Sequence, residues 1–462
     1  MLPAVLGTAA GVSIGVVVAA GSRGPTLVPW PAKVRAAFPF VVGGLAGAAV
    51  ALPVGLVAAL ALAAGGRGSW PVKPVAVGLG VLGAGVAAGA LGRGQVAKKL
   101  TPQGRDLDPA YANAPLNPLV SGSAQSAVSM TELGREGARF VGSVTSADTI
   151  LAVTGLAPVA EPVRVFIGVE AAATVEQRVG LAMAELRRTG AFDRAHLLIQ
   201  APAGSGYANS TPVDVLEILT RGDTASVAIG YGLLPSFLSL GKVPIAAQTQ
   251  KLLLDAITEE LAARAKRPRL LLYGESLGAK VQEAAVPGGP IDLDHYSIAA
   301  ALWVGTPGGE VADGFHALCQ QESITVDRPE EIPVPLPTPR PRVWFLEHDG
   351  DPVVRFRPEL LANRPAWLPL DGRRGRNIPV SMTWRPGITY CQALVDTLFA
   401  TNVKPGDFQS LGHDYRADLG AVATAAYDLA ADAATAARLE TQLRTLEKAK
   451  AELIAQAGPP TG

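Results

Sequence analysis

A serine between two glycines, in the sequence Gly274-Glu275-Ser276-Leu277-Gly278, has the form G-x-S-x-G. The apolar run 270–273 precedes it and the helix-forming segment 277–285 follows it, which is the setting that this motif requires. A serine on such a strand-to-helix turn projects its hydroxyl above the sheet, and the first amides of the helix face the oxyanion that develops during acyl transfer. The motif therefore predicts that Ser276 is a nucleophile. The alternative is an ordinary loop with a capping serine.

A serine nucleophile needs a general base, and the chain contains five histidines. In this arrangement the serine comes first along the chain, then the acid, then the histidine, so the candidates are His316, His348 and His413. His413 lies in a glycine-containing loop near the end of the predicted domain, within Leu411-Gly412-His413-Asp414-Tyr415. We predict His413 as the base, and the alternative is a histidine with a purely structural role.

The acid is expected between the serine and the histidine, after a late strand. The apolar run 343–346 is followed by Glu347-His348-Asp349-Gly350-Asp351-Pro352. Asp351 comes after a glycine turn, beyond the end of the predicted strand, and is the predicted acid; Asp349 is the competing assignment. The carboxylate would fix the tautomer of the imidazole and stabilise the imidazolium.

The oxyanion of an acyl-transfer reaction needs two backbone N–H donors. One is expected from Leu277, the residue after the nucleophile, and the other from a loop after an earlier strand. The run 197–200 ends in Ala201-Pro202-Ala203-Gly204-Ser205-Gly206-Tyr207, where glycines permit a close approach of the backbone. We predict that the amide of Ser205 is the second donor and that Gly204 makes the turn. A simple glycine-rich turn is the alternative.

The elements that position these residues alternate between strand and helix. Short runs that are apolar throughout predict strands, and segments with helical spacing between them predict helices. Continuous apolarity is typical of a parallel sheet that helices cover on both faces, so an α/β fold is predicted. The predicted strands are 163–169, 196–200, 269–273, 299–304 and 343–346, and the predicted helices are 175–188, 244–266 and 277–285.

The first hundred residues contain three long runs without a charged side chain, Met1–Ala20, Ala36–Gly66 and Pro74–Gly92. Each has about 18 residues or more, enough to cross the hydrocarbon core of a bilayer. Their many glycines and alanines would let membrane helices pack closely. A multi-pass transmembrane domain in contact with the lipid bilayer is predicted. The alternatives are the core of a water-soluble domain and, for the first run, a cleaved signal peptide.

Basic residues in the connections between these runs predict the orientation in the cell membrane. The first connection and the segment after the third run would face the same side of the membrane. Together they contain more basic residues than the second connection. This places the large C-terminal part in the cytoplasm. The seven residues on that side are Arg23, Lys33, Arg35, Arg93, Lys98, Lys99 and Arg105, against Arg67 and Lys73 on the other.

The composition excludes several classes of protein. Lys and Arg number 40 and Asp and Glu also number 40, so no basic surplus points to a nucleic-acid partner. A hydrophobic content of 48% with 17% charged residues excludes a disordered chain, and a mean hydropathy of +0.26 is high for a wholly water-soluble enzyme. Cys319 and Cys391 are too few for a disulfide framework or a cysteine-rich metal site. Without metal-ligand spacing, a phosphate-binding loop or a dinucleotide fingerprint after a strand, no metal and no cofactor are expected.

Much of residues 130–420 resembles the α/β-hydrolase family of multi-pass membrane proteins typical of actinobacteria. The resemblance implies an α/β-hydrolase fold, a mostly parallel sheet with helices on both faces, preceded by an N-terminal transmembrane helical domain. It also assigns the nucleophile, acid and base to Ser276, Asp351 and His413. The family's Gly-Thr-Gly-Trp segment is Gly204-Ser205-Gly206-Tyr207 here, and the membrane part is shorter than the family's four or more spans. The matching stretches are 133–141, 190–194, 222–225, 274–278, 301–305, 351–354 and 412–415.

The predicted function is that of a membrane-anchored serine hydrolase that cleaves an ester through an acyl-enzyme on Ser276. A lipid acyl ester or thioester is the leading substrate, because the apolar stretch 231–240 would cover the pocket beside a bilayer; a buried connector is the other interpretation of this stretch. The alternative function is a non-catalytic membrane scaffold or receptor that keeps the hydrolase fold. The predicted domains are a transmembrane helical domain at 1–100, a linker at 101–129, the hydrolase domain at 130–420 and a C-terminal helix and tail at 421–462.

The C-terminal segment is predicted to be helical up to Gly458. Its leucines follow the spacing of a heptad seam, which Lys450 interrupts. Two hypotheses remain open: an amphipathic helix that lies on its own domain, and weak self-association of the chain through this seam. The seam residues are Leu439, Leu443, Leu446, Lys450 and Leu453.

Overall fold

The computed structural model describes residues 22–40, 104–233, 239–308, 310–400 and 408–458, together with Ser13, Val16, Ala19 and Val42. The chain forms two compact units. The larger unit is made of Ala97–Val354 and Asn402–Gly462, and the smaller unit of Met1–Val96 and Arg355–Thr401. Residues 355–401, which the sequence analysis placed in the hydrolase domain, therefore belong with the N-terminal segment.

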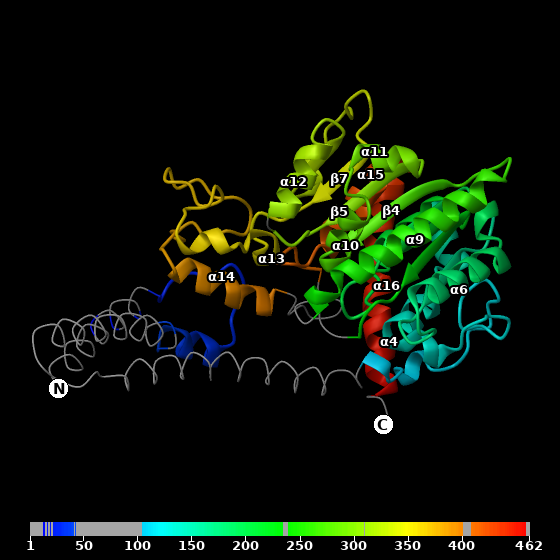
Figure 1. Cartoon of the computed structure of the whole chain (residues 1–462), viewed down its shortest axis with the longest axis horizontal. Coiled ribbons are helices and arrows are strands. Elements are labelled where there is room, and N and C mark those ends of the chain that lie inside the picture. The colour runs from blue at the N-terminus through cyan, green and yellow to red at the C-terminus, as the bar shows by residue number, and fades with distance from the viewer. Residues whose placement is uncertain are drawn as a thin grey trace, which may run out of the picture. The chain divides into compact units, whose positions relative to one another are not determined.

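The larger unit is built around a sheet of seven parallel strands in the order β1-β3-β2-β4-β5-β7-β6 (Figure 1). The predicted parallel sheet is confirmed, with two strands that the sequence analysis missed, β3 and β6. β3 consists largely of small or polar residues, and β6 is a short edge strand. The strands are β1 (Val163–Ile167), β2 (His196–Ala201), β3 (Thr224–Ile229), β4 (Arg269–Glu275), β5 (Ile298–Val304), β6 (Ser323–Val326) and β7 (Val343–Leu346).

Helices cover the sheet in two layers (Figure 1). In one layer α6, α9 and α10 pack side by side; in the other α7 packs against α15, with α5 and α16 outside them. The first turn of α6 is fixed by a capping box, which Thr174 and Gln177 form. The helices of this unit are α4 (Met130–Gly142), α5 (Ala147–Thr154), α6 (Val175–Arg188), α7 (Thr211–Leu219), α9 (Val243–Ala262), α10 (Leu277–Ala285), α11 (Pro290–His295), α12 (Glu310–Cys319), α13 (Pro352–Arg355), α15 (Arg416–Ala426) and α16 (Ala433–Ala457).

The segment before α4, predicted to be a linker, is part of the larger unit. Tyr111, Val120 and Val128 are buried in its core. Val120 forms a parallel bridge with Arg164 of β1, and the backbone N–H of Ser121 donates to the carbonyl of Arg164 at 3.1 Å. These residues therefore extend the fold beyond the edge strand β1.

The C-terminal helix α16 lies on its own unit. Leu439 and Leu443 are buried, and the ammonium of Lys450 donates to Asp214 Oδ2 at 2.9 Å and to Ser210 Oγ at 2.7 Å. The lysine that interrupts the heptad seam is thus explained by an ion pair within the chain. Self-association would have to use other residues of the helix, such as the more exposed Leu453.

The smaller unit joins two segments that are more than 300 residues apart in the sequence. Residues 32–40 are helical, and α14 (Ile388–Phe399) packs against them and the preceding residues. Asp396 of α14 is fully buried, and both of its carboxylate oxygens accept hydrogen bonds from the N-terminal segment. The donors are the backbone N–H groups of Leu27 (3.1 Å) and Val28 (3.5 Å) and the indole N–H of Trp30 (2.6 Å).

The stability of this unit is predicted to fall as the pH rises. Burial raises the pKa of Asp396 to about 7, although its three N–H donors favour the charged form. Because this folded-state pKa exceeds the unfolded value, the folded protein binds the extra proton, and the contribution to stability is complete below about pH 4 and lost as the pH rises through 7. Cys391 of α14 is half-buried against apolar side chains of the N-terminal segment, among them Trp30, so its alkylation should become faster when the two segments separate. After correction for thiolate fraction, alkylation of Cys391 should accelerate by up to about tenfold per pH unit between pH 5 and 7.

The matched control for this prediction is Asp396→Asn, which has no titrating carboxyl at that position. Its corrected alkylation rate should be independent of pH over the same range. An equal pH dependence in the two proteins would show that another group controls the opening.

The three predicted transmembrane runs fall mostly outside the described residues; only Ser13, Val16, Ala19, residues 36–40 and Val42 of them are described. Among the helices of the described part of the chain, none combines the length and the apolarity that a bilayer crossing requires.

Candidate active site

The predicted catalytic residues lie at one edge of the sheet, where the carboxyl ends of β4 and β7 are found. Ser276 follows β4, Asp351 follows β7, and β5 lies between these two strands. Because all strands run parallel, their carboxyl ends share one edge of the sheet, where α/β proteins bind their ligands. His413 reaches the same edge from the loop before α15.

Ser276 occupies a strained turn between β4 and α10. Its backbone has φ 57° and ψ −125°, a conformation that L-residues rarely adopt, and its N–H donates to the carbonyl of Val304 at 2.8 Å. The flanking positions must be glycine, because a Cβ at either of them would clash with the neighbouring backbone. A Cβ on Gly274 would lie 2.7 Å from Cα of Ala279, and a Cβ on Gly278 would lie 2.2 Å from the carbonyl oxygen of Ala201. The G-x-S-x-G motif therefore forms the sharp turn that the sequence predicted.

Asp351 and His413 form a buried pair. Nδ1 of His413 lies 2.6 Å from Oδ2 of Asp351, and the same oxygen accepts the hydroxyl of Tyr415 at 2.6 Å. Oδ1 accepts the backbone N–H of Val353 at 2.8 Å. Burial alone lowers the pKa of His413, but the charge and hydrogen bond of Asp351 outweigh it, and this pKa is raised above its ordinary value. Nε2 of His413 is buried and has no hydrogen-bond partner among the described residues.

The competing acid, Asp349, occupies a different position. Its side chain is half-buried, and its backbone N–H donates to Oδ1 of Asp327 at 2.9 Å. The structure thus pairs the imidazole of His413 with Asp351 rather than with Asp349.

Gly305, the residue after β5, brings the imidazole of His413 close to the serine turn. It directly follows Val304, which accepts the N–H of Ser276. A Cβ on Gly305 would lie 2.7 Å from Cε1 of His413 and 2.7 Å from the ring of Tyr415. The ring therefore packs against a backbone position that only glycine can occupy.

Replacement of Gly305 by alanine is predicted to lower kcat for an ester substrate by about 10²-fold, because the new methyl group displaces the imidazole by about 1 Å. The matched control is Gly155→Ala, since Gly155 also has a positive φ (71°, against 58° for Gly305) but no atom within 4 Å of the added Cβ. Both variants place an alanine at a positive φ, so both should lose Tm, but only Gly305→Ala should also lose kcat. Equal values of kcat in the two variants would contradict the contact.

The predicted oxyanion residues lie at the first residue of α10 and in the loop after β2. Leu277 is the first residue of this helix, where the N–H has no partner within the helix. The loop after β2 is a tight turn, in which Ala203 N–H donates to Tyr207 O at 2.8 Å and Gly206 N–H donates to Ala203 O at 2.9 Å. Ser205 and Gly204 lie within this turn. The close approach of Gly278 to Ala201 sets the loop against the helix.

Glu275, the residue before the serine, fastens this loop. Its Oε2 accepts the amide of Asn209 at 2.6 Å and the hydroxyl of Tyr273 at 2.7 Å. Asn209 in turn accepts the backbone N–H of Thr211 at 2.9 Å. The role of Glu275 could not be predicted from the motif, because its middle positions accept any residue.

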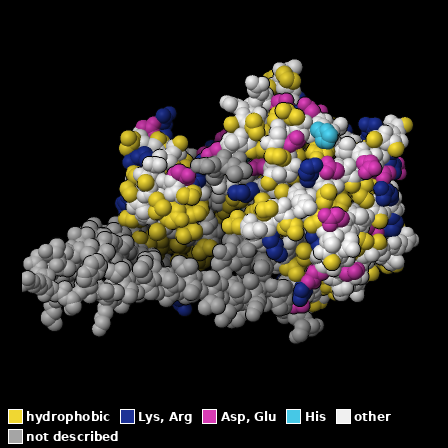
Figure 2. Space-filling view, viewed as in Figure 1, with side chains coloured by type: hydrophobic (Ala, Val, Ile, Leu, Met, Phe, Trp, Pro, Cys, Tyr) yellow, Lys and Arg dark blue, Asp and Glu magenta, His cyan; other side chains and the backbone are white. Residues whose placement is uncertain are grey.

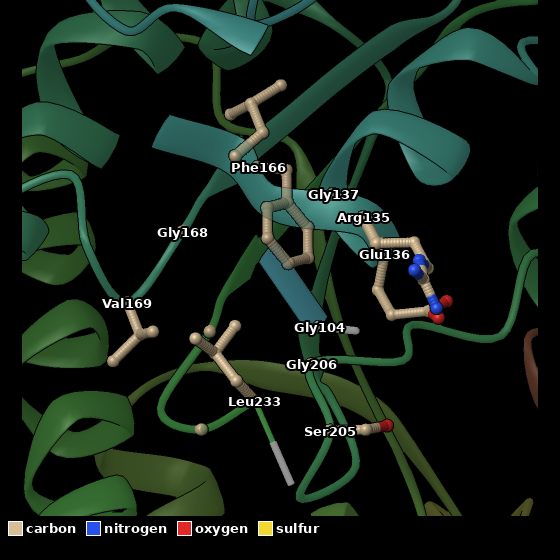
Figure 3. A pocket seen from close by; sticks show the side chains of 13 residues that line it. Gly104, Arg135, Glu136, Gly137, Phe166, Gly168, Val169, Ser205, Gly206 and Leu233 are labelled. Carbon is tan, nitrogen blue, oxygen red and sulfur yellow. The ribbon is translucent and has the colours of Figure 1, made fainter. Parts of the chain in front are cut away.

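A cavity of about 10 Å³, room for roughly one water molecule, lies on one side of the same loop (Figure 3). Ser205 and Gly206 form one wall, and Glu136, Phe166 and Leu233 are among the others. A groove of about 890 Å³ between α9 and α11 lies at the C-terminal end of α10, the end opposite Ser276. Neither therefore has the place and size of a substrate pocket above the serine.

Within the described residues, no group of three or more His, Cys, Asp or Glu side chains could hold a metal ion. The site consists of a serine, a carboxylate–imidazole pair and backbone amides.

A parallel sheet with a serine on the turn after its central strand β4, and a carboxylate–histidine pair at the same edge, defines the α/β-hydrolase class. Residues 163–440 match the Alpha/beta-hydrolase family, and the chain belongs to this family.

Two solved structures resemble the chain, both of them acetyl xylan esterases. One is a structure of acetyl xylan esterase, with 15% identity, a TM-score of 0.23, and coverage of 35% of this chain and 85% of that one. The other is the catalytic core domain of acetyl xylan esterase from Trichoderma reesei, with 15% identity, a TM-score of 0.22, and coverage of 33% and 82%. No curated protein sequence matches the chain.

Proposed function

We propose that the protein is a carboxylic ester hydrolase that forms an acyl-enzyme on Ser276. The hydrogen bond between Asp351 and His413, next to the strained turn of Ser276, carries the proposal, because this combination activates a serine hydroxyl. The membership of the Alpha/beta-hydrolase family supports it.

The residues of the site divide the reaction between them. Oγ of Ser276 attacks the ester carbonyl while Nε2 of His413 accepts its proton, and the protonated ring then gives this proton to the leaving alcohol. Asp351 holds the ring through Nδ1 and stabilises its positive charge. The N–H groups of Leu277 and Ser205 donate to the oxyanion, with Gly204 shaping the turn. A water molecule, activated by His413 in the same way, releases the acid and restores the serine.

A fluorophosphonate probe tests this proposal directly, because it forms a covalent bond only with an activated serine. The full-length protein should be labelled on Ser276, Ser276→Ala should not be labelled, and Ser381→Ala, which changes an exposed serine of the smaller unit, should be labelled like the wild type. Absence of labelling in all three proteins would favour the alternative of a non-catalytic scaffold.

We also propose that the protein is held at the cell membrane by residues 1–100 and that its substrate is a lipid acyl ester or thioester. The smaller unit supports this proposal, because its described residues include ten Lys and Arg against three Asp and Glu, a composition suited to anionic lipid headgroups. Figure 2 shows hydrophobic side chains gathered over α14 and the segment before it. The exposed apolar side chains of this unit include Phe40, Leu361, Leu370, Val380, Leu394 and Leu398.

Washing of membranes with alkaline carbonate tests the attachment. The full-length protein should stay in the membrane fraction, as a protein with transmembrane helices does. Release into the wash would exclude transmembrane helices and leave, at most, attachment through the surface of the smaller unit.

A further inference from the structure

His348 is a second buried histidine beside the candidate site. It follows β7 by two residues, and its side chain is 0% exposed. Its Nε2 lies 2.9 Å from Oδ2 of Asp418, and its Nδ1 lies 3.2 Å from the carbonyl oxygen of Gly412. Asp418 belongs to the first turn of α15, and Gly412 directly precedes His413. The ring thus joins α15 to the backbone of the loop that carries His413.

His348 also contacts this loop on the other side of His413. Its ring stacks on that of Tyr415, with centroids 4.0 Å apart and an interplanar angle of 26°. Its backbone N–H donates to the hydroxyl oxygen of Tyr415 at 3.1 Å, and that hydroxyl donates to Asp351 at 2.6 Å. The residues before and after His413 are therefore both tied to His348.

The hydrogen bonds of His348 define whether each ring nitrogen is a donor or an acceptor. The carbonyl oxygen of Gly412 can only accept, so Nδ1 of His348 is the donor. The contact between Nε2 and Asp418 then needs a further proton, held on the ring or on the carboxyl group. The hydroxyl of Ser410, three residues before His413, donates to the same oxygen of Asp418. Both nitrogens of His348 are occupied, so neither can accept the proton of Ser276.

We propose that His348, held by Asp418, is a positioning residue that sets the orientation of the His413 imidazole. The proposal rests on the proposed role of His413 as the base. The site then contains two carboxylate–imidazole pairs with different tasks: Asp351 holds the ring of His413, and Asp418 with His348 holds the backbone on which that ring is carried. Loss of the second pair would free the carbonyl of Gly412 and let the base move, and a displacement of about 1 Å costs about 10²-fold in rate.

The experiment compares full-length variants at position 348. His348→Leu removes both ring nitrogens, whereas His348→Asn keeps an amide N–H donor near the position of Nδ1. We expect His348→Leu to lower kcat for a short-chain ester by about 10²-fold with KM changed by less than about threefold, and His348→Asn to recover most of this loss. Asp418→Leu, which removes both carboxylate oxygens and cannot hydrogen-bond to Nε2 of His348, should lower kcat in the same way. The control is Tyr427→Phe, which removes a buried hydroxyl bonded to Leu272 at 3.1 Å, remote from the loop, and should leave kcat unchanged.

A second measurement does not depend on turnover. The chain has five histidines, so NMR of histidine labelled with ¹³C at Cε1 gives five ring signals. The His413 signal, assigned through its loss in His413→Gln, should shift in His348→Leu and return towards the wild-type position in His348→Asn. This shift is expected even if Ser276 proves not to be the nucleophile, so the two proposals can fail separately.

Two results would overturn the proposal. If His348→Leu and His348→Asn lose kcat and Tm to the same extent, His348 is only part of the packed core. If the His413 signal is the same in His348→Leu as in the wild type, the ring of His348 does not control the base.

Discussion

Replacement of Ser276 by alanine is expected to lower kcat for a short-chain ester by about 10⁶-fold, as in serine hydrolases that lose their nucleophile. The reason is that the acyl-enzyme can no longer form, while the backbone donors remain. The turn itself should survive, because its anchor is the N–H of residue 276 bonded to Val304 at 2.8 Å, and this group is unchanged. The measurement is steady-state hydrolysis of a chromogenic acetate ester by the full-length protein.

Ser381→Ala is the matched control, and its kcat should equal that of the wild type, since Ser381 lies exposed in the smaller unit. A kcat for Ser276→Ala within tenfold of the wild-type value would place the nucleophile elsewhere in the chain.

Much of the sheet could be predicted because buried parallel strands are apolar on both faces. The run Leu270–Tyr273 and the motif after it predicted the central turn, and the structure has β4 and α10 there. β3 was missed because Thr224, Ala225 and Ser226 give little hydrophobic signal, although all its residues are buried. Its place between β1 and β2 comes from tertiary pairing, which local hydrophobicity does not encode.

The relation between the acid and the base could be predicted only in part. Two aspartates, Asp349 and Asp351, follow the same strand, and their spacing of two residues does not tell which one reaches the histidine. In the structure, hydrogen bonds from Tyr415 and Val353 orient the carboxylate of Asp351 towards His413. The need for glycine at position 305 likewise depends on a ring more than 100 residues away in the sequence.

The smaller unit could not be predicted from sequence patterns. Asp396 lies on an amphipathic helix, where a lone carboxylate normally faces water. Here its partners are Leu27, Val28 and Trp30, and no periodicity links segments so far apart. The composition of residues 355–401 did not indicate that they belong to the smaller unit rather than to the larger one.

Replacement of Asp351 by asparagine is expected to lower kcat by about 10⁴-fold, the loss known for serine proteases, because the amide holds the imidazole in the wrong tautomer. The pH profile should change as well. The base must be neutral, so kcat/KM rises as the pH rises through the pKa of His413, which Asp351 holds above its ordinary value. Without this carboxylate, burial lowers the pKa of His413, so the acid limb of the remaining activity should move to lower pH.

The control is Asp349→Asn, which changes the neighbouring carboxylate and should keep kcat within about threefold of the wild type and leave the acid limb in place. The two mutated residues lie two positions apart in the same loop, so a general disturbance of the loop would lower the activity of both variants. If Asp349→Asn is inactive and Asp351→Asn is near wild type, the acid is Asp349. If both keep full activity with the acid limb unmoved, the His413 imidazole works without a carboxylate partner, and the hydrogen bond of 2.6 Å serves only to pack the core.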